Sequence, residues 1–192
     1  MTDDRPPTPS APGGAPGAAR PAAPPRLVGL PPVVSAQTVV LILGSFPGAA
    51  SLRAKQYYGH PQNHFWRILQ SLWPEPPLPG RDDYPARCAW LLDRGLGLWD
   101  VYAACEREGS LDTDIRHAQL NDFEGLIART PRLAAIAHNG GESFKHAKTV
   151  RASVGPALAS LRLPSSSPAN ASWSFDKKRN AWAEALASFG LV

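Results

Sequence analysis

The segment TVVLIL at residues 38–43 constrains the fold more than any other part of the chain. It is rich in β-branched residues and apolar at nearly every position, a pattern typical of a strand buried on both faces. The run ends at GSFPG, residues 44–48, whose glycines permit a tight turn and a close approach of the backbone to a ligand. A strand buried in this way predicts a parallel sheet with helices on both sides.

Three further segments have the pattern of short strands, and helical segments lie between them. The predicted strands are residues 97–102, 133–137 and 157–163. One predicted helix begins near Pro61, and three others cover residues 84–94, 142–150 and 175–189. Ser174 is predicted as the N-cap of the last helix. Strands that alternate with helices predict an α/β fold with a mostly parallel, four-stranded central sheet.

Length and composition predict one domain preceded by a tail. The chain has 192 residues and is 43% hydrophobic, which is enough for a single core. Residues 1–25 consist mainly of Pro, Ala and Gly, so we expect a disordered tail followed by one domain at 26–192. The tail has no apolar stretch typical of a signal peptide, and no later segment reaches transmembrane length. We therefore expect a cytoplasmic monomer that does not bind a membrane.

Charge and cysteine content narrow the choice of partners. The net charge of +4 mildly favours a polyanionic partner such as DNA. The two cysteines, Cys88 and Cys105, are too few for a disulfide framework and exclude a four-cysteine iron–sulfur site. His60 and His64 lack the glutamate of a zinc-protease helix, so we expect no metal.

Ligands of parallel sheets bind beyond the carboxyl ends of the strands, so the loops there are the candidate site. One such loop holds Ser165, Ser166, Ser167 and Asn170, whose hydroxyls and backbone N–H groups suit phosphate oxygens; a Ser-rich turn is the structural alternative. Asp100 ends a predicted strand, where a catalytic carboxylate can lie, although a structural role is the stronger expectation for it.

The segment QYYGHPQNHFW, residues 56–66, combines aromatic rings, amides and imidazoles. A nucleobase offers a face for stacking and an edge for hydrogen bonds, and this mixture suits both. Phe65 and Trp66 are expected in the core of the following helix. Asn63 has two possible roles, capping that helix or binding a base.

Several blocks in the same order resemble the uracil-DNA glycosylase superfamily, and in particular its hypoxanthine-DNA glycosylase branch. The resemblance covers nearly everything from Leu27 onward and is carried by these segments: GLPP, GSFPG, QYYGHPQNHFW, WDVYAACEREGSLDTDI and LPSSSPANASWSF. It implies a three-layer α/β/α domain that needs no cofactor. It also implies that the damaged nucleotide leaves the duplex for a pocket, where water replaces the base at C1′.

The resemblance also implies roles for single residues. At the third position of the first loop, relatives often have an Asp or Asn that positions the attacking water. This chain has Phe46 at that position. Phe46 cannot accept a proton, so the lead catalytic role goes to Asn63, with Asn139 as a second residue that contacts the base. The base pocket is predicted from eight residues: Gly44, Ser45, Phe46, Pro47, Gly48, Tyr58, His60 and Asn139.

The function expected from these features is hydrolytic removal of a deaminated base from double-stranded DNA, which leaves an abasic site. Hypoxanthine is the first candidate, followed by uracil and xanthine. Three alternatives stay open. They are a uracil- or mismatch-specific glycosylase on the same fold, a non-catalytic binder of damaged DNA, and a hydrolase of free nucleosides.

Overall fold

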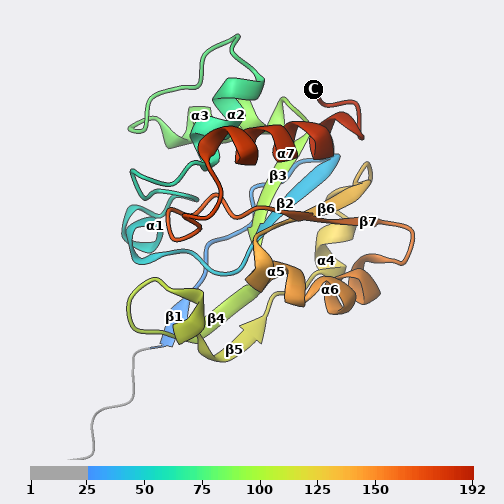
Figure 1. Cartoon of the computed structure of the whole chain (residues 1–192). Coiled ribbons are helices and arrows are strands. Elements are labelled where there is room, and N and C mark those ends of the chain that lie inside the picture. The colour runs from blue at the N-terminus through green and yellow to red at the C-terminus, as the bar shows by residue number, and fades with distance from the viewer. Residues whose placement is uncertain (1–25) are drawn as a thin grey trace, which may run out of the picture.

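The computed structural model describes residues 26–192, so the predicted tail lies outside the described residues. Its centre is a four-stranded parallel sheet (Figure 1) with the strand order β3-β2-β6-β7. The strands are β3 (Leu96–Asp100), β2 (Val40–Gly44), β6 (Ala135–Asn139) and β7 (Ala159–Leu163). All five residues of β2 are buried, as the apolar run predicts. The predicted α/β class and parallel sheet are confirmed.

Helices cover both faces of this sheet and complete three layers (Figure 1). One layer contains α2 (Phe65–Leu72), α3 (Tyr84–Leu92) and α7 (Phe175–Ala187). The opposite layer contains α4 (Glu124–Ile127), α5 (Gly141–Lys145) and α6 (Ala147–Val154). Ser174 caps α7 as predicted, because its side chain accepts a hydrogen bond from the backbone N–H of Lys177.

A second, antiparallel sheet was not predicted. Its order is β1-β4-β5, formed by β1 (Arg26–Val28), β4 (Tyr102–Glu106) and β5 (Arg116–Leu120). The strand predicted at residues 97–102 therefore ends early, at Asp100, and the chain enters β4 two residues later. Between β4 and β5 lies the single 3-10 turn η1 (Asp112–Asp114).

Two helical predictions need correction, and one short helix was not predicted. The helix predicted at 142–150 is two helices, α5 and α6, because His146 between them has φ −93° and ψ 3°. Helix α2 begins at Phe65 rather than near Pro61, and the short helix α1 (Ala49–Ala54) was missed. Among residues 26–192, no helix is both long and apolar enough to cross a bilayer.

The parallel sheet brings the ends of its four strands to one edge. Gly44 of β2 is paired in register with Asp100 of β3, and Asn139 of β6 with Leu163 of β7. Since all four strands run in the same direction, the four loops that follow them lie at this edge of the sheet. The fold thus assembles the candidate site from segments far apart in the sequence.

Candidate active site

A pocket of about 1000 Å³ lies at the carboxyl ends of the four central strands. Every residue predicted for the site lines it, although these residues come from four separate segments. They are Gly44, Ser45, Phe46, Pro47, Gly48, Tyr58, His60, Asn63, Asn139, Ser165, Ser166, Ser167 and Asn170. The structure therefore brings the predicted residues together, while their roles in binding and catalysis remain predictions.

The loop after β2 is fixed by partners that the sequence did not indicate. Ser45 Oγ donates a hydrogen bond to Asp112 Oδ1 at 2.7 Å. The buried Arg107 donates to the carbonyl oxygen of Pro47, and its guanidinium carbon lies 5.0 Å from the centre of the Phe46 ring. Phe46 is itself only 6% exposed. It therefore forms a wall of the pocket whose ring is already contacted by Arg107.

Of the two roles that the sequence left open for Asn63, the structure shows the contact with the start of α2, and binding of a base stays a prediction. Its Oδ1 accepts a hydrogen bond from the backbone N–H of Phe65 at 2.9 Å, which satisfies a free donor at the start of α2. Its Nδ2 group forms no hydrogen bond within residues 26–192 and belongs to the lining of the pocket. Asn63, which precedes the N-cap residue His64, thus accepts the first N–H of the helix through oxygen and keeps its amide N–H groups available to a ligand.

Asn139 is held by Ser166 at both side-chain atoms. Asn139 Nδ2 donates to Ser166 Oγ at 2.9 Å, and Asn139 Oδ1 accepts the backbone N–H of Ser166 at 2.8 Å. Ser166 is fully buried and therefore does not make the predicted contact with phosphate. Its role is to hold the Asn139 side chain. The second N–H of the Asn139 amide is not used by Ser166. The Asn139 side chain also lies beside the Tyr58 phenol, whose pKa it lowers against the effect of burial.

The other residues of the loop after β7 keep partial exposure. Ser165 Oγ accepts the backbone N–H of Ser167 at 3.2 Å, and Asn170 Nδ2 donates to the Ser165 carbonyl oxygen at 3.1 Å. The buried Lys178 donates through Nζ to the carbonyl oxygen of Ser167 at 3.1 Å. These bonds give the loop a defined shape at the rim of the pocket.

Asp100 and Tyr58 form a polar pair at the floor of the pocket. Asp100 is 4% exposed, and its Oδ2 has no hydrogen-bond partner; the buried hydroxyl of Tyr58 has none either. Both groups approach Gly44, where an added Cβ would collide with Asp100 Oδ1 and lie 3.4 Å from the Tyr58 hydroxyl. Any larger residue at position 44 would therefore force the Asp100 side chain to move.

The environment of Asp100 favours its neutral form. Burial raises the pKa of this carboxyl to about 8; the negative charge of Asp112 acts in the same direction, and the positive charge of Arg107 opposes both. Burial likewise raises the pKa of Tyr58 above its usual value. Sequence reasoning gave Asp100 little weight. The signal that identifies it is its register opposite Gly44, which a single sequence does not contain.

Three side chains at the rim of the pocket were also missed. Leu111 and Trp173 line it and are large apolar residues with exposed fractions of 55% and 42%. Arg162 lines the same rim and is exposed. An apolar and basic rim around a polar floor suits a ligand that carries both stacked rings and phosphates.

The two histidines of residues 56–66 lie in different surroundings. His60 lines the pocket and accepts the Gln62 backbone N–H through Nδ1 at 3.2 Å, whereas His64 packs edge-on against Phe175. Over residues 26–192, no cluster of three or more His, Cys, Asp or Glu side chains has an arrangement that holds a metal ion.

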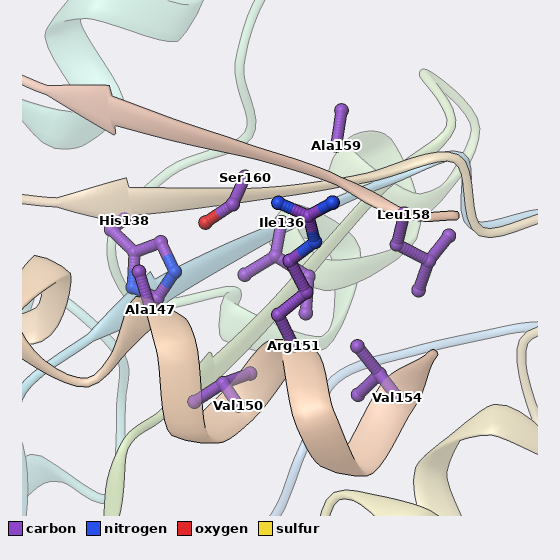
Figure 2. Close-up of a pocket in the computed structure, with 9 residues that line it drawn as sticks. All are labelled: Ile136, His138, Ala147, Val150, Arg151, Val154, Leu158, Ala159 and Ser160. Atoms are coloured by element: carbon purple, nitrogen blue, oxygen red, sulfur yellow. The ribbon is translucent and has the colours of Figure 1, made fainter. Parts of the chain in front are cut away.

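A second cavity, shown in Figure 2, lies between α6 and the strands β6 and β7. It leaves no room for a water molecule. His138 borders it; Ser143 Oγ donates to the Leu43 carbonyl oxygen and so accepts from His138 Nδ1. Burial lowers the pKa of His138 to about 4, so this imidazole is neutral and belongs to the core.

Comparison with known proteins points to one family. The family model described as the uracil DNA glycosylase superfamily matches residues 31–189. A relative from Methanosarcina barkeri named hypoxanthine DNA glycosylase is 40% identical over 162 residues, which cover 82% of this chain and 96% of that protein. A relative of the same name from Methanosarcina acetivorans is 38% identical over 160 residues, with the same coverage of 82% and 96%.

A solved structure resembles the whole described domain. It is a solution NMR structure from Methanosarcina acetivorans, described as a candidate uracil DNA glycosylase. It superposes with a TM-score of 0.72 at 36% sequence identity and covers 84% of this chain and 96% of the other. The three-layer arrangement around a parallel sheet is therefore shared with that protein.

Proposed function

The chain belongs to the uracil DNA glycosylase superfamily, and from this membership we propose the substrate and the residues of its reaction. It is a DNA glycosylase for deaminated bases, as its family and its relatives named hypoxanthine DNA glycosylase indicate. Hypoxanthine is the proposed principal substrate, in double-stranded DNA. Uracil and xanthine are the secondary substrates.

The observation that carries the proposal is the pocket at the strand ends. It is open to the surface, it has a volume of about 1000 Å³, and its polar groups lie below an apolar and basic rim. An enzyme that acts on a base in a duplex has to rotate the nucleotide out of the stack into such a pocket. The volume accommodates a purine as well as a pyrimidine.

Asn63 is the proposed catalytic residue. When the glycosidic bond breaks, positive charge develops on the sugar and negative charge on the departing base, so donors directed at the base lower the barrier. The Asn63 Nδ2 group is such a donor, since its Oδ1 is already bonded to the start of α2. Water then attacks C1′, and the products are the free base and an abasic site.

The rim residues provide the proposed contacts with the duplex. Ser165, Ser167 and Asn170 bind phosphate oxygens, and Arg162 adds a positive charge beside them. Leu111 and Trp173 are placed to fill the gap in the stack that the flipped base leaves. We propose that the enzyme acts as a monomer on cytoplasmic DNA.

The proposal is tested with labelled duplexes that carry hypoxanthine, uracil or xanthine opposite each normal base. After incubation, alkali cleaves the strand wherever an abasic site has formed. We expect cleavage first in the hypoxanthine duplexes and none in undamaged DNA. Faster cleavage of the uracil duplexes would reassign the enzyme to uracil, and binding without cleavage would favour a non-catalytic protein.

A further inference from the structure

We propose that Asp100 and Tyr58 bind the flipped base at the floor of the pocket, and that Asp100 donates a hydrogen bond to the base as it departs. The inference rests on the proposed function, because it concerns the base that this pocket receives. In this proposal Asp100 is a second hydrogen-bond donor to the base, in addition to Asn63. It lies at the floor of the pocket, away from the contacts at the rim.

Unused hydrogen-bonding capacity is the first argument. Within residues 26–192, Asp100 Oδ2 and the Tyr58 hydroxyl are both buried and form no hydrogen bond of normal length, although the Asn139 side chain is near enough to lower the pKa of Tyr58. Such groups are costly to bury unless a ligand or water completes them. Both lie against Gly44, so the two groups point to one place in the pocket. The Tyr58 ring is stacked on Phe65 with centroids 3.9 Å apart, which fixes where its hydroxyl lies.

The conformation of Tyr58 is the second argument. Its φ of 54° lies in the left-handed region, which is unfavourable for an aromatic residue and persists only where surrounding contacts enforce it. The backbone strain places the hydroxyl beside Asp100 instead of in solvent. Residues held in such conformations cluster at ligand sites.

The charges around Asp100 determine which form the base meets. Asp112 faces it from the 3-10 turn and Arg107 from the segment after β4. Its other titratable neighbours are phenols whose own ionisation Asp100 disfavours, namely Tyr57, Tyr58 and Tyr84. Because burial raises the pKa of Asp100 by more than Arg107 lowers it, the carboxyl is neutral at pH 7 and its O–H can donate a hydrogen bond.

A neutral carboxyl matches the chemistry of the leaving group. The C1′–N bond breaks with its electron pair going to the base, while water oxygen bonds to C1′ and one water proton completes the neutral base. Negative charge therefore accumulates transiently on the oxygen and ring nitrogens of the base. A donor at the floor stabilises it there, whereas an ionised Asp100 would repel it.

The test measures single-turnover excision of hypoxanthine between pH 6 and 10 for the parent, Asp100→Asn and Asp100→Ala. We expect the parental rate to fall above about pH 8, where Asp100 ionises. Asp100→Asn keeps a hydrogen-bond donor that does not titrate, so its rate stays within about tenfold of the parental rate at pH 7. The rate of this variant should not show the loss above about pH 8 that ionisation of Asp100 causes in the parent. Asp100→Ala should lose roughly a hundredfold at pH 7, the effect of one removed donor.

Three results would each overturn the inference. Asp100→Ala could excise at the parental rate, Asp100→Asn could be as slow as Asp100→Ala, or Asp100→Asn could lose activity at alkaline pH as the parent does. The ionisation of the substrate itself is common to all variants and cancels in the comparison. Thermal unfolding of each variant shows that it is folded. If the parent excises no base at all, the proposed function fails instead, so the two failures are distinct.

A second readout is independent of catalysis. Free hypoxanthine is titrated into the parent, Asp100→Asn and the matched control Asp122→Asn, whose carboxylate lies outside the pocket lining. The parent should bind the base more weakly above about pH 8 than below it, and the control should behave like the parent. Binding by Asp100→Asn should lack this weakening, and equal pH dependence in all three proteins would contradict the inference.

Discussion

Asn63 uses its side-chain oxygen for α2 and leaves its amide group free, so the two functions can be separated by substitution. Asn63→Ser retains a favoured capping hydroxyl but has no amide donor. We expect its excision rate to fall about 100- to 1000-fold with little change in thermal stability. Asn63→Ala should show the same fall in rate and lose about 1 kcal/mol of stability as well. Single-turnover kinetics and thermal melts measure both, and parental excision by Asn63→Ser would exclude the amide as a donor.

Asp100 makes the stability of the domain depend on pH. Its pKa is raised to about 8 in the folded chain, whereas an Asp in the unfolded chain has a pKa near 3.8. Between these two values the folded state holds the proton that the unfolded state has lost, so stability falls as pH rises from about 4 to about 8.

Asp100→Asn should remove this dependence, because an amide does not titrate in this range. From pH 5 to pH 8, the melting temperature of the parent should drop relative to that of Asp100→Asn. A difference of about 2–4 °C corresponds to about 1 kcal/mol in a chain of this size. If the melting temperatures of the parent and of Asp100→Asn changed equally between pH 5 and pH 8, Asp100 would be ionised in the folded protein.

At the scale of elements, two rim loops carry the large apolar side chains Leu111 and Trp173. If they fill the gap in the stack, Leu111→Ala or Trp173→Ala should slow excision from duplex DNA by at least about tenfold. Excision from single-stranded DNA should change less, because there is no stack to repair. Val28→Ala is the control, since Val28 is 71% exposed and lies outside the pocket lining. Equal losses on both substrates would contradict a role in the stack.

The positive charge of Arg162 at the rim of the pocket leads to a prediction about DNA binding. Arg162→Gln should weaken DNA binding across sequences and reduce the slope of log K against log salt by about 1, the value for one lost phosphate contact. Arg132→Gln is the matched control, because exposed Arg132 precedes β6 and so lies at the opposite end of the sheet. Fluorescence anisotropy at several salt concentrations gives both slopes. Unchanged salt dependence in Arg162→Gln would remove Arg162 from the DNA contact.

The sequence predicts the central elements better than the peripheral ones for a physical reason. The strands β2 and β6 are almost entirely buried, so their apolar runs are readable. Strand β5 is exposed at all five residues, and nothing in its polarity distinguishes it from a loop. The break between α5 and α6 was missed because the apolar spacing continues across His146 while the backbone does not.

At the scale of the whole molecule, the pocket residues that the structure describes belong to 26–192, and the predicted tail precedes them in the sequence. A chain that lacks residues 1–25 should therefore excise hypoxanthine at the parental rate and melt at the parental temperature. Strand β1 begins at Arg26 and pairs with β4, so a longer deletion through Val28 is the contrasting variant, and it should be less stable. Slower excision by the shorter deletion would show that the tail contributes to the reaction.

The candidate site was predicted as a set of residues but not as an arrangement. Loops at the ends of parallel strands converge by topology, so alternation of strands and helices was sufficient to collect Asn139 and the Ser-rich loop, whereas Asn63 was singled out by the family resemblance. Hydrogen-bond partners depend on atomic positions instead. The sequence therefore did not reveal that Ser166 is buried against Asn139, or that Asp100 lies unpaired beside Tyr58.

The double hydrogen bond between Asn139 and Ser166 also has a geometric consequence. It joins the end of β6 to the loop after β7, two neighbouring strands whose spacing the sheet already sets. The two bonds thus hold this side of the pocket at the strand spacing of the sheet, and we expect it to resist widening for a bulkier base. Lesions enlarged by an added ring or a long alkyl chain would then be rejected by size before any donor contacts them.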